Sequence, residues 1–209
     1  MKIGIIGSGN IGGTLGPLWA KAGHEVFFSS RHPEKLQNLV HDSGPRTRAG
    51  AIEAAARFGD VVLLAVPFGA LPDLGPAIAP LLAGKTVLDA SNPYPNRDGQ
   101  AATDALASGR GTGVATAGYL PGAKVVRAFN TVSSRTLEQQ AHRATNRVGI
   151  PLASDDPAAL AQAVALTSDA GFDPVPVGAL PTAARFDPGT NVFNSGMSGP
   201  EIRRTLALE

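Results

Sequence analysis

The sequence predicts an α/β fold in which a doubly wound, mostly parallel sheet of seven or eight strands is covered by helices. Short apolar runs alternate with segments of helical periodicity over about 180 residues, as they do where strands and helices follow one another. The run VVLLAV at residues 61–66 is apolar at every position, which is typical of a parallel strand buried on both faces.

A glycine motif near the start of the chain supports this fold. A strand at residues 2–6 runs into a G-x-G-x-x-G sequence, and an amphipathic helix and a second strand at residues 24–28 complete a βαβ unit. With 25 glycines in the chain, about 0.35 such motifs are expected by chance, so the context decides. The glycines permit a tight turn and the close approach of a pyrophosphate. We therefore predict a Rossmann-type dinucleotide site at Gly7, Ser8, Gly9, Asn10, Ile11 and Gly12.

The remaining elements are predicted from periodicity and from the residues that interrupt it. Further strands are expected at residues 47–50, 61–66, 85–89, 124–128, 147–153 and 172–177. Helices are expected at residues 33–41, 51–60, 69–82, 113–119, 136–141, 157–170 and 199–208. Residues 94–110 are polar and longer than an ordinary connection. We interpret them as a functional or mobile loop with at most a short helix at residues 101–107.

The end of the second strand indicates which dinucleotide binds. NAD-binding chains of this fold place an acidic residue there, whereas this chain has Ser29-Ser30-Arg31. Arg31 can pair with a 2′-phosphate, Ser30 can donate its hydroxyl, and Lys35 adds a charge one turn into the next helix. We predict NADP, and an ordinary solvated basic edge is the alternative. The absence of the acid also disfavours an S-adenosylmethionine methyltransferase.

The carboxyl ends of the later strands, where ligands of such sheets bind, carry few groups that transfer protons. They offer Pro67, Phe68, Ser91, Asn92, Pro93, Phe129, Asn130 and Thr131. The Tyr-x-x-x-Lys arrangement is absent and no lysine ends a strand. No histidine accompanies residues 89–92, which we interpret as a helix cap and not as a metal site or a serine nucleophile. No catalytic residue is predicted, and the pattern favours hydride transfer to a flavin or deazaflavin that needs no proton donor.

Composition sets limits on the partners. The net charge of +1 gives no basic field for nucleic acid or a membrane surface, and no run approaches the ~18 apolar residues of a membrane span. The start of the chain lacks the apolar region of a secretory signal, so we expect a soluble cytoplasmic protein. The zero cysteine count excludes disulfides and thiol nucleophiles. We divide the chain into an NADP-binding domain at residues 1–180 and a C-terminal extension at residues 181–209.

The order and spacing of these motifs resemble those of the NADPH-dependent coenzyme F420 reductases, whose fold is shared by the cytosolic domain of certain metalloreductases. The matching stretches are IGIIGSGNIG at 3–12, SR at 30–31 with Lys35, AVPF at 65–68, DASNP at 89–93, VVRAFNTV at 125–132, ASDD at 153–156, and residues 171–180 with Arg185. The resemblance implies that residues 8–11 with Ser30, Arg31 and Lys35 hold the phosphates of NADP.

The same resemblance places the nicotinamide and the acceptor. It implies that Val66 and Pro67 line the ribose and nicotinamide, that Asn130 and Val132 edge the ring, and that the ring lies between Pro67, Asn92 and Asn130. Some family members have histidine at the Asn130 position, and full-length members carry a longer C-terminal region that contributes to the acceptor site and a homodimer. This chain departs from the family at both places, and dimerisation through its C-terminal segment is expected from the resemblance alone.

These observations lead to one functional hypothesis with alternatives. The hypothesis is an NADP-dependent oxidoreductase that transfers hydride between NADPH and a flavin-like small-molecule acceptor, with F420 or a flavin as second substrate. The alternatives are a reductase of another small molecule or of a ferric chelate, and an NADP-sensing binding module without turnover.

Overall fold

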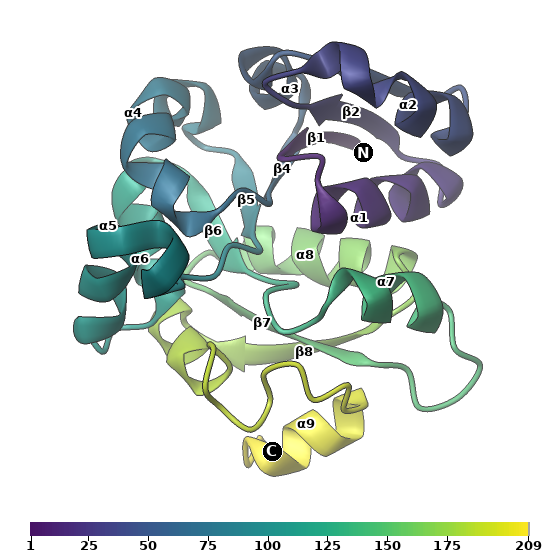
Figure 1. The fold of residues 1–209 in the computed structure, drawn as a ribbon. Coiled ribbons are helices and arrows are strands. Elements are labelled where there is room, and N and C mark those ends of the chain that lie inside the picture. Colours follow the sequence, from purple (N-terminus) through teal and green to yellow (C-terminus); the bar gives the residue numbers. More distant parts are fainter. Residues whose placement is uncertain (209) are drawn as a thin grey trace.

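The computed structural model describes residues 1–208 and contains one eight-stranded sheet (Figure 1). The strand order is β3-β2-β1-β4-β5-β6-β7-β8, and all neighbours are parallel except β6 and β7. The strands are β1 (Lys2–Ile6), β2 (Glu25–Ser29), β3 (Thr47–Gly50), β4 (Val61–Leu64), β5 (Thr86–Asp89), β6 (Lys124–Arg127), β7 (Gly149–Ser154) and β8 (Asp173–Gly178). The predicted doubly wound, mostly parallel sheet is thus confirmed.

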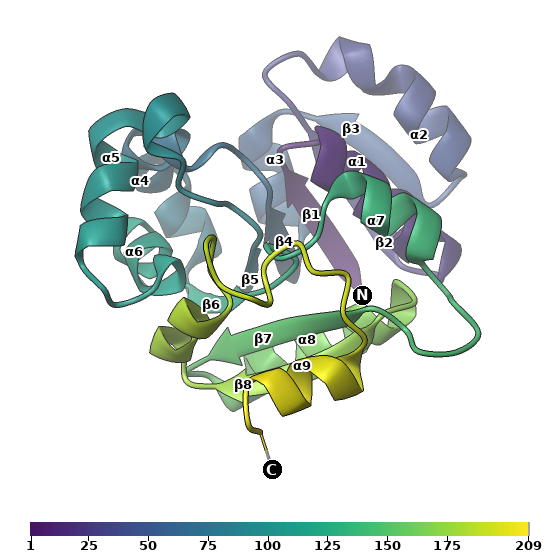
Figure 2. The same ribbon diagram turned by 60° about the horizontal axis from the view of Figure 1, so that its bottom comes forward.

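Helices cover both faces of the sheet (Figures 1 and 2). One face carries α1 (Asn10–Lys21), α2 (Gln37–Ser43), α7 (Ser134–Gln140) and α8 (Pro157–Asp169). The other carries α3 (Ile52–Phe58), α4 (Leu71–Leu82) and α6 (Thr112–Tyr119), with α5 (Pro95–Ala107) packed outside them. Short 3₁₀ helices are η1 (Pro33–Leu36), η2 (Phe68–Ala70) and η3 (Leu180–Arg185), and α9 (Gly199–Thr205) ends the described chain.

Strand β4 shows why the central strands are apolar without alternation. Successive side chains of a strand point to opposite faces. Val61 and Leu63 enter the core beneath α1 and α8, whereas Val62 and Leu64 enter the core beneath α3 and α4. All four side chains are fully buried. The strand therefore needs apolar residues on both faces, as the unbroken run at residues 61–66 predicted.

The C-terminal extension packs against the end of the sheet. Phe186, Ile202 and Leu206 form a third apolar cluster with Ala153 of β7 and Val175 of β8. Figure 2 shows α9 beside β8, and the preceding segment running toward the ends of the central strands. The last residue of the predicted extension, 209, lies outside the described residues. The predicted helix at residues 199–208 is observed as the shorter α9.

The interpretation of residues 94–110 as a loop is wrong, because α5 occupies most of this segment. Pro95 stands in the first turn, where proline is favoured, and the Asp98 carboxylate accepts the Tyr94 N–H at 2.9 Å. Gly99 interrupts the helix with φ 63° and ψ −141°. This kink and the polar composition conceal the helical periodicity.

Within residues 1–208 no helix is both long enough and apolar enough to cross a membrane.

Candidate functional site

Two adjoining cavities lie where strands β1 and β4 end, at the point where the sheet order reverses direction. This is the place where open α/β sheets bind their ligands. One cavity has a volume of about 700 Å³ and runs from Arg31 across the glycine turn to α4. The other has about 460 Å³ and extends from the glycine turn to Asn130. They share Gly9 and residues 65–67, so together they form a continuous groove.

The groove brings together most of the residues predicted for the cofactor. The first cavity is lined by Gly7, Ser8, Gly9, Ser30, Arg31, Val66 and Pro67. The second adds Asn10, Ile11, Asn92 and Asn130. Gly12 lies in neither cavity, since its Cα is buried against the Gly7 carbonyl and Ile5. Lys35 is exposed on η1 and lines neither cavity. The roles of these residues in cofactor binding stay predictions.

The start of α1 has the features of a phosphate site. No side chain caps this twelve-residue helix, and its first turn contains no acidic residue. The unpaired N–H groups and the positive end of the helix dipole therefore face the groove. A Cβ built on Gly9 would meet no atom within 4 Å, so there is open space directly above the turn. The residues present fit a pyrophosphate at this position.

Two serine hydroxyls in the groove are left with a proton to donate. Ser8 Oγ accepts the Ser29 N–H at 3.0 Å, and Ser30 Oγ accepts the His32 N–H at 3.1 Å. Because each hydroxyl oxygen acts as acceptor toward the protein, its own proton is available to an anionic oxygen. Glu34 Oε1 is 3.3 Å from the His32 ring, and neither residue lines the first cavity. The first cavity is therefore suited to a ligand with several phosphates.

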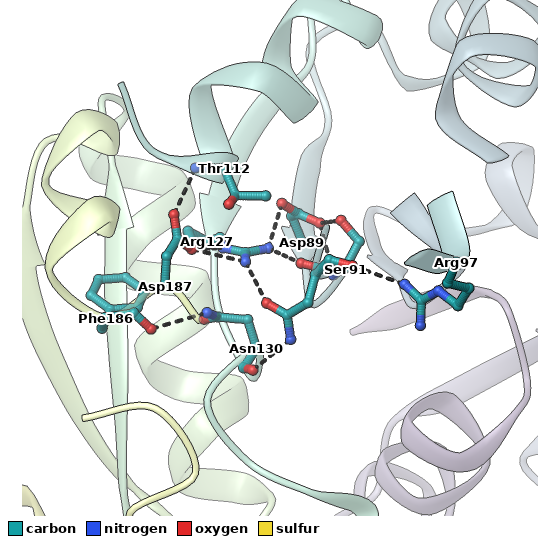
Figure 3. Close-up of polar contacts among 9 residues, drawn as sticks. Asp89, Ser91, Arg97, Thr112, Arg127, Asn130, Phe186 and Asp187 are labelled. Carbon is teal, nitrogen blue, oxygen red and sulfur yellow. Dashed lines mark hydrogen bonds and ion pairs between the residues drawn. The ribbon is translucent and has the colours of Figure 1, made fainter. Parts of the chain in front are cut away.

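The far side of the second cavity is built on a buried arginine that the sequence analysis did not identify (Figure 3). Asp89 and Arg127 are paired residues in the register of β5 and β6. Arg127 Nη1 is 2.9 Å from Asp89 Oδ2, and Nη2 is 2.9 Å from Asp187 Oδ1. Nη1 also donates to the Ser91 carbonyl, Nη2 to Asn92 Oδ1, and Nε to Asp187. All five N–H groups of the guanidinium thus have partners.

This network holds two carboxylates in ion pairs with Arg127 and orients two amides. The side chains of Asp89 and Arg127 are fully buried, so Asp89 is an ion-pair partner and not the predicted helix cap. Asn92, whose Oδ1 is held by Arg127, donates from Nδ2 to the Asn130 carbonyl at 2.8 Å. Asn130 Nδ2 donates to Phe186, while Asn130 Oδ1 is buried without a partner in residues 1–208. Asn130 therefore carries a buried acceptor, unpaired within the described chain, at the edge where the nicotinamide is predicted.

A third ion pair lies at this cavity, at the start of α5. Arg97 lines the cavity, and its Nη2 is 2.7 Å from Asp98 Oδ2. Burial of the Asp98 carboxyl opposes ionisation, but hydrogen bonds from Arg97, Tyr94 N–H and Gly69 N–H outweigh it and lower the pKa of Asp98. The ion pair is therefore formed at neutral pH.

The lowered pKa of Asp98 predicts a pH-dependent contribution to stability. The unfolded chain has the ordinary aspartate pKa of about 3.9, so this stabilisation is fully present above about pH 4 and is lost as the pH falls through the lower folded pKa. We expect Asp98→Asn to be less stable than the wild type at pH 7, with a difference that shrinks by pH 2.5. Urea unfolding at both pH values measures it, with Asp104→Asn in the same helix as control. An equal difference at both pH values would contradict the prediction.

The fold, the glycine turn and the groove have the form of a Rossmann-type dinucleotide-binding protein, and comparison with known proteins finds similarity to NADP-dependent oxidoreductases. Residues 2–93 match the model of the family described as NADP oxidoreductase, coenzyme F420-dependent. The family resemblance noted in the sequence is thereby confirmed. The match covers β1 to β5 and ends directly after Asn92.

Two solved structures and one curated protein extend the similarity beyond this segment. A hypothetical protein of Sinorhizobium meliloti is 29% identical, with a TM-score of 0.78 and 91% of each chain covered. A protein of Arthrobacter sp. FB24, provisionally named an F420-dependent NADP reductase, is 26% identical, with a TM-score of 0.71, covering 88% of this chain and 87% of that one. The metalloreductase STEAP3 of Rattus norvegicus is 28% identical over 182 residues, which are 87% of this chain. The chain spans about a third of that protein's length (35%).

Proposed function

We propose that this chain catalyses hydride transfer between NADPH and a flat, flavin-like acceptor of the deazaflavin F420 type. The observation that carries the proposal is the composition of the second cavity. Among the residues that line it there is no aspartate, glutamate, lysine or histidine, and Arg97 is the one charged side chain. A carbonyl acceptor needs a group that protonates the developing alkoxide. A flavin-like ring takes hydride directly and obtains its proton from water.

The residues of the groove would divide the work between the two ends of the cofactor. NADPH supplies the hydride when it is bound. The N–H groups at the start of α1 and the hydroxyls of Ser8 and Ser30 bind phosphate oxygens, and Arg31 pairs with the 2′-phosphate. Val66 and Pro67 form one side of the ring site, and Asn92 and Asn130, fixed through Arg127, form the other. The protein thereby accelerates the reaction mainly by positioning two rings.

Turnover with a panel of acceptors tests the proposal. NADPH oxidation is followed at 340 nm with F420, FMN, FAD, a ferric chelate with and without flavin, and a set of small ketones. We expect oxidation well above background with F420 or a flavin and none with the ketones. Ketone reduction alone would contradict the proposal. No oxidation with any acceptor, combined with tight NADPH binding, would favour the NADP-sensing module.

Arg31 provides a separate test of the cofactor. It is exposed at the end of β2 and lines the first cavity, where it would form charge-assisted hydrogen bonds with the 2′-phosphate. We expect Arg31→Ala to weaken NADPH binding about tenfold, equivalent to about 1.4 kcal/mol, and to leave NADH binding unchanged. Calorimetric titration of both cofactors measures the change. Arg46→Ala, which removes a charge from the loop between α2 and β3, is the control, and an unchanged preference in Arg31→Ala would contradict the assignment.

Reduction of a ferric chelate is the second candidate. The observation in its favour is the similarity to metalloreductase STEAP3, which extends over residues of this chain well beyond the family match. Flavin-dependent reduction of iron in the acceptor panel would support it.

We further propose that the chain forms a homodimer through its C-terminal segment and that it is located in the cytoplasm. Light scattering of the purified protein tests the dimer.

A further inference from the structure

We propose that Arg97 is the recognition site for an anionic group, a phosphate or carboxylate, on the hydride acceptor. This inference rests on the proposed function, and it adds the chemical class of the second substrate and the residue that selects it. Arg97 would bind the acceptor at a place separate from the ring, so that an acceptor with an acidic side arm is preferred over its neutral counterpart.

The side chain of Arg97 is held in one orientation although it is half exposed. Nε donates to Asp98 Oδ1 at 2.8 Å, and Nη2 donates to Asp98 Oδ2 at 2.7 Å and to the Asn92 carbonyl at 2.8 Å. The guanidinium carbon lies 4.8 Å from the centre of the Tyr94 ring. The Asp98 side chain is 1% exposed, against 47% for Arg97. Asp98 therefore serves as a buried anchor that fixes the guanidinium at the surface of the cavity, as a preorganised binding group requires.

Within residues 1–208, Arg97 lines a cavity without a competing carboxylate, and part of its guanidinium is unpaired. Nη1 of Arg97 has no hydrogen-bond acceptor in the described chain, so two N–H groups remain for a ligand. No acidic residue lines this cavity, so nothing in its wall repels an anion. Ser133 and Asn194 add polar groups to the same cavity. An anionic oxygen at Arg97 Nη1 would thus gain a charge-assisted hydrogen bond.

The connections of Arg97 place it on the acceptor side of the groove and away from the phosphates of NADP. Through Nη2 it contacts Asn92, which donates to the Asn130 carbonyl and is held by Arg127. These two asparagines form the edge expected beside the nicotinamide. The phosphates have their own donors at the start of α1 and at Ser8 and Ser30. Arg97 therefore belongs to the part of the groove where the second substrate meets the ring.

Binding of FMN and riboflavin to the protein saturated with NADP⁺ tests this inference. The two probes share one ring system and differ in a phosphate, so the ratio of their dissociation constants reports recognition of the anion. We expect the wild type to bind FMN about tenfold more tightly than riboflavin. Arg97→Gln should reduce the ratio to less than twofold, and Arg97→Lys, which keeps the charge but not the planar fork, should give an intermediate ratio. Arg135→Gln, on exposed α7, removes the same charge outside the cavity and should leave the ratio at the wild-type value.

Three results would overturn the proposal. The first is equal affinity of the wild type for FMN and riboflavin, or binding of neither. The second is an unchanged ratio in Arg97→Gln when its Tm matches that of Arg97→Lys. The third is an equal loss of NADP⁺ and FMN affinity in Arg97→Gln, which would assign Arg97 to the cofactor site. The measurement is made at equilibrium, so its outcome is independent of turnover. Failure of the proposed function appears separately, as the absence of NADPH oxidation across the acceptor panel.

Discussion

Replacing Arg127 by methionine is expected to lower the free energy of unfolding by about 3–5 kcal/mol, because removal of one partner leaves buried charges uncompensated. The Arg127 side chain is fully buried between Asp89, which is also fully buried, and Asp187, which is 10% exposed. Methionine fills much of the same volume as arginine. The decrease in the free energy of unfolding therefore comes mainly from the loss of the charge and not from a cavity. Urea unfolding at pH 7, followed by circular dichroism, measures it.

Two further variants locate the origin of this loss. Asp187→Asn keeps Arg127 paired with Asp89 and weakens the tie to the C-terminal extension, so we expect a smaller loss of about 1–3 kcal/mol. Arg135→Met, on the exposed surface, should change stability by less than about 0.5 kcal/mol. A loss below about 1 kcal/mol in Arg127→Met would show that the ion-pair network contributes little to the folded state.

Substituting Gly9 by alanine is expected to weaken NADPH binding about 30-fold, equivalent to about 2 kcal/mol, and to leave stability within about 0.5 kcal/mol. The reason is the open space above Gly9, which a methyl group would occupy in place of a pyrophosphate oxygen. Fluorescence titration with NADPH measures binding, and thermal unfolding without cofactor measures stability.

Gly7→Ala is the matched comparison. The same methyl group at Gly7 would lower the stability of the fold and would not occupy the space of the ligand. Gly7 has φ +98°, and its Cβ would lie 2.4 Å from the Ala65 carbonyl oxygen. Strain and overpacking together should destabilise the protein by about 3 kcal/mol. If Gly9→Ala bound NADPH as the wild type does, the pyrophosphate would not lie above the glycine turn. If it unfolded as readily as Gly7→Ala, the space above Gly9 would not be open in the folded protein.

The fold was largely predictable because its determinants are local. Glycine spacing, unbroken apolar strands and helical periodicity each involve residues within about 20 positions of one another, and they identified all eight strands. The helix α5 was missed for two reasons. Gly99 interrupts its helical periodicity. Its N-terminal turn is stabilised by Asp98, a residue type that is equally common in polar loops.

The part of the candidate site that is formed by residues close together in the sequence was predictable. The part that is formed by residues far apart in the sequence was not. The glycine turn and Arg31 lie within one βαβ unit, and the groove contains them. The contact of Arg127 with Asp187 joins residues separated by 60 positions, which no spacing rule links. The sequence did contain one indication of this contact. Arg127 ends the strand KVVR, which is otherwise apolar after its first residue. A charged side chain in a buried strand requires a partner of opposite charge. The register of β5 and β6 shows that Asp89 is this partner.

The antiparallel pairing of β6 and β7 brings the C-terminal segment to the second cavity, where changes in its sequence can alter the cavity wall. Arg127 pairs with Ala153 near the end of β7, so the earlier residues of β7 project past the ligand edge of the sheet. The C-terminal segment lies along this projection, and Phe193 and Asn194 reach the second cavity from it. The C-terminal segment thus adds Phe193 and Asn194 to a wall that is otherwise formed by residues 90–97 and 129–133. Insertions or exchanges after η3 can therefore reshape one wall of the second cavity without altering the glycine turn after β1.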